Sequence, residues 1–182
     1  WYQGERNSKS IAGAKLYGHQ LPLMISDWRR RGGQGDFPFM WVQLPNYKKR
    51  NDDPNAVSVW AQTRESMAKT LWLPNTGMAT AIDIGEARDI HPKNKQDVGQ
   101  RLALWALAKT YERSDIAYSG PIYNSMHAVG NKIEIRFDYA CGGLKAGPEG
   151  LKDFEIAGSD KKFVAASTEL QGESLVVFSP DV

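Results

Sequence analysis

The sequence contains a single cysteine, so no internal disulfide can hold the fold together and a hydrophobic core has to do so. No apolar run approaches the roughly 18 residues that would cross a bilayer, and the longest runs resemble Phe37–Val42. Neither sign of charge dominates, because 23 basic side chains face 21 acidic ones in 182 residues. A net charge of +2 produces no general attraction for nucleic acid or an anionic membrane, and neither is expected as a partner.

Several motifs that bind metals or cofactors are also missing. The chain has no Cys-x-x-Cys pair, no His-Glu-x-x-His segment, no calcium-binding loop and no glycine-rich phosphate loop before a helix. We therefore expect no metal and no cofactor. The two basic clusters, Arg29–Arg31 and Lys48–Arg50, are expected to be solvated faces rather than anion sites.

Residues 1–115 alternate between helical and strand-like patterns. Leu21, Met24, Ile25 and Trp28 fall on one face of a helix, and further helices are predicted over residues 57–71 and 93–112. The apolar runs Phe37–Leu44 and Met78–Ile84 indicate buried strands, and Trp1–Gln3 is interpreted as the end of another. Such alternation predicts a parallel sheet flanked by helices.

Residues 116–182 have a different period. Lys132–Tyr139 alternates polar and apolar side chains over eight residues, which is typical of a half-buried antiparallel strand. Phe154–Ile156, Lys162–Ala166 and Ser174–Phe178 indicate further strands, separated by glycine-containing turns. The second part is therefore predicted to be a β-rich module.

The Asp89-Ile90-His91-Pro92 segment is the first candidate for chemistry. It follows a predicted strand and precedes a predicted helix, and sites in open α/β sheets form in such loops. In an extended segment Asp89 and His91 can point the same way, so that the carboxylate orients the imidazole as a base. The alternative is a surface loop in which Asp89 only caps the following helix.

The opening segment Trp1-Tyr2-Gln3-Gly4-Glu5-Arg6-Asn7 is the second candidate. The backbone N–H of Gly4 and the side-chain amide of Asn7 are two donors that could stabilise a developing oxyanion. The alternative is an ordinary turn followed by a helix cap.

Taken together, these segments resemble the sialate O-acetylesterases, which belong to the SGNH-type (GDSL-like) hydrolases. The resemblance runs through Trp-Tyr-Gln-Gly-Glu-x-Asn, Gly35–Phe39, Pro74–Met78 and, most specifically, Asp89–Lys95, and continues into Gly120–Tyr123 and Ala157–Phe163. It implies an α/β fold: a partial flavodoxin-like SGNH hydrolase core over residues 1–115, followed by an incomplete antiparallel β module over residues 116–182.

The resemblance also implies roles for residues. His91 matches the catalytic base and Asp89 the acid beside it, while Gly4 and Asn7 match the oxyanion-hole glycine and asparagine. The implied reaction is the removal of acetyl groups from sugar hydroxyls, with the 9-O-acetyl group of sialic acid as the first expectation. A secreted, periplasmic or lysosomal location is expected on the same basis.

The nucleophile of the family has no counterpart in this chain. The resemblance implies a serine in a Gly-x-Ser motif at the end of a first strand, well upstream of the Trp1–Gly4 segment, and residues 1–182 do not include a counterpart of that strand end. Three sites could in principle substitute for it: Ser125 beside His127, Cys141 and His19. Each is better explained as a structural or surface residue. We therefore expect a fragment truncated at both ends, inactive alone, whose sheet an upstream segment or a second chain completes.

Two alternatives to this function stay open from the sequence. The six tryptophans and the β-rich second part would also suit a non-catalytic carbohydrate-binding module or a structural remnant. A xylan or other polysaccharide acetylesterase would retain the same chemistry on a different sugar.

Overall fold

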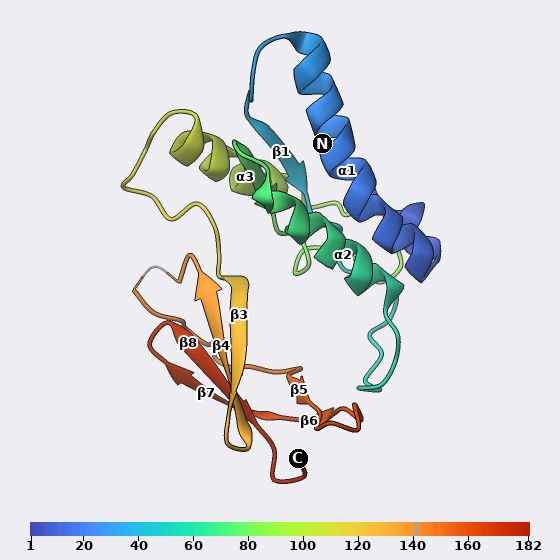
Figure 1. Ribbon diagram of the computed structural model, residues 1–182, viewed down its shortest axis with the longest axis vertical. Coiled ribbons are helices and arrows are strands. Elements are labelled where there is room, and N and C mark those ends of the chain that lie inside the picture. The colour runs from blue at the N-terminus through green and yellow to red at the C-terminus, as the bar shows by residue number, and fades with distance from the viewer. Residues whose placement is uncertain (141) are drawn as a thin grey trace. The chain divides into compact units, whose positions relative to one another are not determined.

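The computed structural model describes residues 1–140 and 142–182, which form two compact units (Figure 1). The first unit contains Trp1–Arg50 and Val57–Tyr118, and the second contains Asn51–Ala56 and Ser119–Val182. Residues 51–56 are thus a short excursion of the chain: they belong to the second unit, although the residues before and after them belong to the first. The predicted division into domains at residues 115 and 116 stays a prediction.

The sheet of the first unit is parallel, as predicted. β1 (Phe39–Val42) pairs with β2 (Thr76–Ala79), and Trp41 lies opposite Met78. On the other side of β1, the Trp1 amino group donates to the Met40 carbonyl at 2.9 Å, and the Val42 N–H donates to the Trp1 carbonyl at 2.9 Å. These are the two bonds of a parallel bridge, so the opening of the chain leaves the sheet beside β1.

Three helices flank this sheet. They are α1 (Ile11–Gly32), α2 (Val59–Lys69) and α3 (Lys95–Lys109), with single 3-10 turns η1 (Asn7–Lys9) and η2 (Thr70–Trp72). All three were predicted, but α1 begins ten residues before the apolar pattern that indicated it. Ser10 explains that start, because its hydroxyl accepts from the Gly13 N–H and caps the helix.

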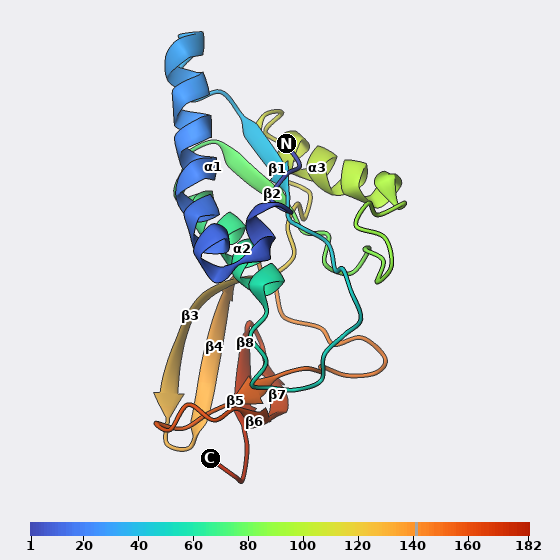
Figure 2. The ribbon, with the colours of Figure 1, turned by 90° about the vertical axis from the view of Figure 1, so that its right-hand side faces the viewer.

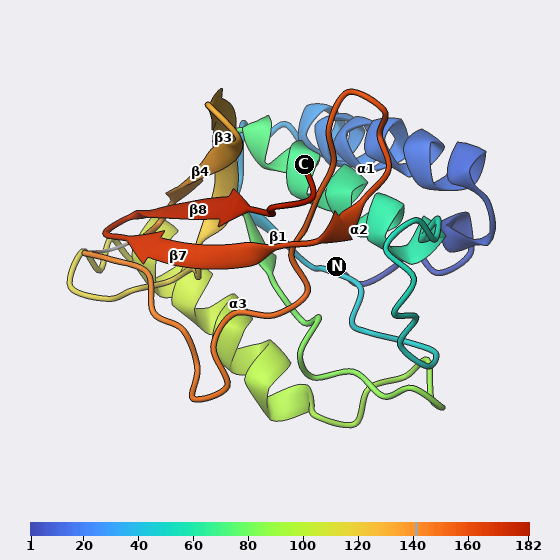
Figure 3. The same ribbon diagram turned by 90° about the horizontal axis from the view of Figure 1, so that it is seen from below.

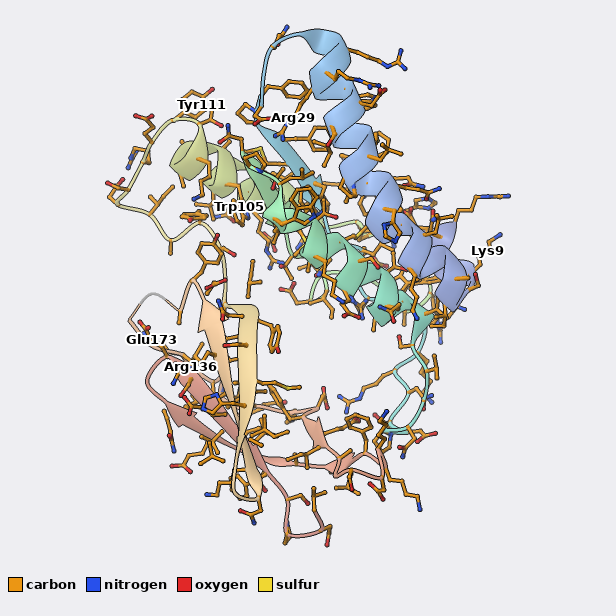
Figure 4. The ribbon with its side chains drawn as sticks, viewed as in Figure 1. Lys9, Arg29, Trp105, Tyr111, Arg136 and Glu173 are labelled. Atoms are coloured by element: carbon orange, nitrogen blue, oxygen red, sulfur yellow. The ribbon has the colours of Figure 1, made fainter. Side chains whose placement is uncertain are left out.

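The helices cover the two faces of the sheet differently. Figure 2 shows β1 and β2 between α1 on one side and α3 on the other. The core on the α1 and α2 side contains apolar side chains from both helices and both strands: Tyr17, Leu21, Ile25, Phe39, Trp41, Leu44, Met67, Leu73 and Met78. On the α3 side, Trp105 is buried against β2, and Figure 4 labels it on α3.

Arg29 corrects the expectation of a solvated basic cluster at the end of α1. Its side chain is 6% exposed, and its guanidinium donates to the carbonyls of Phe37, Pro74 and Asn75. These carbonyls belong to the segments that lead into β1 and β2, so Arg29 fastens α1 to the amino edge of the sheet. Arg30 and Arg31 are exposed and pair with Asp27.

The strand predicted over Met78–Ile84 is wrong in its second half. The ladder with β1 ends at Ala79, and the chain then turns, with the Ile84 N–H donating to the Ala81 carbonyl. The longer strand was predicted because the run Met78–Ile84 is mostly apolar and Gly85 follows it. The physical reason for the difference is that β1 ends at Val42, so the ladder has no further strand partner there.

The second unit is built on an antiparallel sheet with strand order β3-β4-β8-β7. Its strands are β3 (Ile122–Val129), β4 (Lys132–Asp138), β7 (Ser167–Gln171) and β8 (Ser174–Phe178), and Figure 3 shows β7 beside β8. The predicted alternation over Lys132–Tyr139 corresponds to β4. β7 was not predicted, because Leu170 is its only large apolar side chain.

A small second core lies on one face of that sheet. Ile156, Leu175 and Val177 are buried there, and β5 (Glu155–Ile156) pairs with β6 (Val164–Ala165) beside it. The excursion of residues 51–56 is held by Asn55, whose side-chain amide bonds both the N–H and the carbonyl of Phe163.

Candidate functional site at the carboxyl edge of the parallel sheet

Three segments of the first unit leave the carboxyl edge of the same sheet. They follow Trp1, β1 and β2, which lie side by side in that order. Loops at this edge are where open α/β sheets place their sites. Both pairs of predicted site residues lie on these segments: Gly4 and Asn7 follow Trp1, and Asp89 and His91 follow β2.

Gly4 is packed tightly where the opening segment turns. Its φ is +144°, and a Cβ at this position would lie 2.9 Å from Met67 Cε, so a side chain would meet both strain and a neighbour. The Gly4 carbonyl accepts from the backbone N–H groups of Asn7 and Ser8, at 3.0 and 3.2 Å. Its own N–H donates to no acceptor within the part of the chain that the structure describes.

Asn7 is held by both hydrogens of its amide. Nδ2 donates to the Gly13 carbonyl at 3.1 Å and to Gln20 Oε1 at 2.9 Å. The first acceptor belongs to the backbone of α1 and fixes the side chain, whereas the second is an exposed side chain that can move. Asn7 can therefore donate to an oxyanion only if Gln20 gives way.

Asp89 and His91 are brought close together. The Asp89 carboxylate accepts from the backbone N–H of His91 at 2.9 Å, and the same oxygen lies 3.7 Å from His91 Nδ1. The His91 side chain is 79% exposed, so it is not packed in one orientation. Rotation of the imidazole would bring Nδ1 within hydrogen-bonding distance of the carboxylate.

The loop that carries these two residues is fastened to the unit at several points. Arg101 of α3 donates to the Thr80 carbonyl at 2.6 Å and to both carboxylate oxygens of Asp83, at 2.6 and 2.7 Å. Further along, the Glu86 carboxylate accepts from the Lys93 N–H at 3.3 Å. These bonds hold both ends of the loop, which contains almost no regular secondary structure.

The pairing of Asp83 with Arg101 predicts a dependence of stability on pH. The hydrogen bonds from Arg101 lower the pKa of Asp83 below 3.8, against the opposing effect of partial burial. A carboxyl whose pKa is lower in the folded state stabilises the fold above its unfolded pKa, and this contribution is lost as the pH falls through the folded value.

We expect Arg101→Gln to lower the free energy of unfolding by up to about 1 kcal/mol at pH 6.5, a small effect because both side chains are partly exposed to solvent. Near pH 3 the effect should be much smaller, because Asp83 is then partly protonated. Urea unfolding at the two pH values measures this difference. Lys9→Gln, at an exposed lysine on η1, is the control and should show the same small effect at both values. An Arg101→Gln effect that does not change with pH would contradict the prediction.

The two predicted pairs lie on opposite sides of β1. Strands in a sheet are spaced by roughly 4.8 Å, so segments that leave the two neighbours of β1 start about 10 Å apart. No hydrogen bond or ion pair joins Gly4 or Asn7 to Asp89 or His91 among the described residues. Their assignment to one site stays a prediction.

The residues considered as substitute nucleophiles fall elsewhere. Ser125 and His127 lie on β3 in the second unit, where His127 Nε2 is 3.0 Å from Glu134 Oε2 on β4. His19 is exposed on α1. Cys141 lies outside the described residues.

A shallow pocket of about 390 Å³ lies between the opening segment and α1, and sequence reasoning did not find it. Gln20, which accepts from Asn7, lines it, and Tyr17 donates from its hydroxyl to the Gln3 carbonyl at 2.8 Å. The full lining is Trp1, Gln3, Tyr17, Gln20, Leu21 and Met24. The pocket therefore adjoins the Asn7 amide.

The described residues also contain neither a metal-binding cluster nor a membrane-spanning helix. No three His, Cys, Asp or Glu side chains gather into a group that could hold a metal ion there. None of the helices in that part of the chain is long and apolar enough to cross a membrane.

A parallel sheet flanked by helices is the α/β arrangement of an SGNH-like hydrolase fold. Residues 1–108 match the family described as carbohydrate esterase, sialic acid-specific acetylesterase. The chain belongs to this family.

Named relatives agree with this assignment. Human sialate O-acetylesterase is 36% identical over 154 residues, covering 76% of this chain and 29% of that protein, and the mouse protein is 37% identical over the same length. The crystal structure of a carbohydrate acetylesterase from Xanthomonas citri matches with a TM-score of 0.90 and 41% identity, covering all of this chain and 42% of that one. The chain thus spans less than half the length of each relative.

Proposed function

We propose that residues 1–118 supply the base, the acid and the oxyanion donors of a carbohydrate O-acetylesterase, with O-acetylated sialic acid as the substrate. The observation that carries this proposal is that Gly4, Asn7, Asp89 and His91 all follow parallel strands at one edge of one sheet. The names of the relatives, which are sialate and carbohydrate acetylesterases, support the choice of substrate.

In the proposed reaction a serine hydroxyl attacks the acetyl carbonyl carbon. His91 Nε2 takes the hydroxyl proton and passes it to the departing sugar oxygen, leaving an acetyl group on the serine. Water then attacks the acetyl group, His91 takes a proton from that water, and the proton returns to the serine as acetate leaves. Proton transfer by such a base contributes about 10²–10⁴ in rate, and Asp89 stabilises the charged imidazole.

The Gly4 N–H and Asn7 Nδ2 would hold the negative oxygen in both steps. Each donor of this kind is worth on the order of 10²–10³ in rate. The Gly4 N–H is free to do so among the contacts described, whereas Asn7 first has to exchange its bond to Gln20.

The serine has to come from a segment outside residues 1–182 in this proposal, because the Gly-x-Ser segment of the family precedes the part that matches Trp1–Asn7. The Gly172-Glu173-Ser174 triplet of this chain is no substitute, since Ser174 begins β8 in the second unit. We place that segment beside Trp1–Gln3, on the side opposite β1, where it would extend the parallel sheet. The pocket lined by Trp1, Gln3 and α1 supports this placement, because one of its lining residues, Gln20, accepts a hydrogen bond from the Asn7 amide.

The test is a chimera in which the part of the Xanthomonas citri acetylesterase that precedes its matched region is fused to Trp1. The 182-residue chain alone is expected to release nitrophenol from an aryl acetate no faster than background, whereas the chimera is expected to turn over. Replacing the donated serine by alanine should abolish that turnover.

Turnover by the chain alone that is lost in His91→Ala and kept in Cys141→Ala would contradict the need for an outside serine. A chimera that folds, as judged by a cooperative melt, and still fails to hydrolyse aryl acetate or O-acetylated sialic acid would contradict the proposed function. Comparing O-acetylated sialic acid with acetylated xylan then decides which sugar is preferred.

A non-catalytic carbohydrate-binding role is the second candidate. Exposed aromatic side chains favour it, because Trp28 and Trp72 are 46% and 72% exposed and can stack on sugar rings. The same chimera separates the two functions: His91→Ala should remove hydrolysis and leave sugar binding intact if the protein is an esterase.

A further inference from the structure

Asn46 lies four residues beyond the end of β1 and bonds to the loop that carries Asp89 and His91. Its side-chain Oδ1 accepts from the Gly85 N–H at 2.7 Å. The next residue, Tyr47, forms a parallel bridge with Glu86, and the Lys48 N–H donates to the Ala87 carbonyl at 3.1 Å. Three consecutive residues of one loop therefore run alongside three consecutive residues of the other.

The approach at the first of these contacts is unusually close. A Cβ at Gly85 would lie 2.1 Å from the Asn46 backbone oxygen and 2.4 Å from Asn46 Oδ1. Only glycine fits at residue 85. The Asn46 side chain is long enough to reach the Gly85 N–H from the neighbouring loop. The close approach of the two loops therefore depends on glycine at residue 85.

The β1 side of this contact is firmly held. Pro45 is fully buried, and its carbonyl accepts from the indole N–H of Trp60 on α2 at 2.6 Å. The ring of Tyr47 also packs on Trp60, with 5.4 Å between ring centroids. Asn46 therefore projects from a segment that is anchored to α2. Its bond to Gly85 restrains the following loop, which has little regular secondary structure.

The other side of the contact leads directly to His91. Glu86, which follows Gly85, forms an antiparallel bridge with Asp89, whose N–H donates to the Glu86 carbonyl at 3.4 Å. The Asp89 carboxylate in turn holds the His91 N–H at 2.9 Å. Only three residues thus lie between Gly85, which donates to Asn46, and Asp89, and they form a hydrogen-bonded turn.

We infer that Asn46 is a positioning residue for His91: it fixes the start of the turn from which Asp89 and His91 project. This inference rests on the proposed function for the role of His91, but the bond itself is a property of the 182-residue chain. Small displacements of a catalytic base cost much of the rate, so the effect should fall on kcat rather than on KM.

The experiment compares Asn46→Ala with Asn46→Asp, which keeps an oxygen in place to accept the Gly85 N–H. Asn124→Ala is the matched control, because Asn124 is an exposed asparagine of the second unit that bonds Asp138. Hydrogen exchange of the Gly85 amide, measured by NMR on the 182-residue chain, is expected to be about fivefold faster in Asn46→Ala, as for loss of one hydrogen bond. Exchange in Asn46→Asp and Asn124→Ala should match the parent chain.

Two further readouts separate positioning from a structural role alone. Backbone order parameters of residues 86–91 should fall in Asn46→Ala and recover in Asn46→Asp. In the chimera, kcat should fall about tenfold in Asn46→Ala with KM unchanged, and Asn46→Asp should restore it.

The possible failures are distinguishable. Faster Gly85 exchange with unchanged order parameters and unchanged kcat would overturn the inference, as would unchanged exchange in Asn46→Ala. A folded chimera with no activity in any variant would overturn the proposed function instead, and the positioning role of Asn46 would be rejected with it even if the bond is present.

Discussion

Replacing His91 by glutamine in the active chimera is expected to lower kcat by about 10²–10⁴-fold, the usual contribution of a general base. The fold should not suffer, because the His91 side chain is 79% exposed and its backbone N–H, which binds the Asp89 carboxylate, is retained in glutamine. Initial rates on an aryl acetate, together with a thermal melt, measure the two effects separately.

Asp89→Asn provides the matched comparison. Asparagine keeps an oxygen that can accept the His91 N–H, but it removes the negative charge that stabilises an imidazolium. We expect a smaller loss than in His91→Gln, with the melting temperature again unchanged. Equal activity of the parent chimera and both variants would show that another residue acts as the base, and the Asp89-x-His91 loop would then be a surface loop.

The elements that the sequence predicts well are those whose pattern repeats over many residues. The alternation that begins at Lys132 corresponds to β4, and the parallel order of strands and helices in the first unit follows from the spacing of apolar residues. Patterns of this kind succeed because burial of one face decides the structure locally. A strand can end before its apolar pattern does when its partner strand ends early. β1 ends at Val42, and the strand predicted to reach Ile84 therefore stops at Ala79.

Charged residues are harder to place from the sequence. Arg29, Arg30 and Arg31 look alike in a run, yet only Arg29 is buried. Its guanidinium donates to the carbonyls of residues 37, 74 and 75. The sequence around Arg29 does not indicate acceptors that lie so far along the chain. Only the position of Arg29 in the helix indicates that it is buried, because it follows Ile25 by four residues on the same buried face.

The candidate site divides in the same way. Asp89 and His91 are close in sequence, and the structure places them close in space, as their spacing suggested. The contacts of Asn7 with Gln20 and of Asn46 with Gly85 join residues 13 and 39 positions apart. Such bonds depend on how whole elements are packed, so neither the Gln20 contact nor the Asn46 contact was predictable from a local motif.

Gly77 provides a second prediction, on the stability of the sheet that carries the site. It lies on β2 opposite Met40, and a Cβ at this position would be 2.7 Å from Cδ2 and Cε3 of Trp105. Trp105 is 2% exposed and packs edge-on against Tyr118, so its ring cannot move aside freely. We expect Gly77→Ala to lower the free energy of unfolding by about 2 kcal/mol, in the range for overpacked cores.

Gly99 on α3 is the matched control for this change. A Cβ there meets nothing within 4 Å, so Gly99→Ala should instead raise the free energy of unfolding by about 0.5–1 kcal/mol, because alanine is the better helix former. Urea unfolding of the two variants should therefore give shifts of opposite sign. The cost of Gly77→Ala should also shrink in a Trp105→Phe background, where the smaller ring leaves room for the methyl group. An equal loss of unfolding free energy on Gly77→Ala in the parent chain and in the Trp105→Phe background would contradict this explanation. It would show that contact with the indole is not the cause, and that α3 packs on β2 less tightly than the 2.7 Å approach implies.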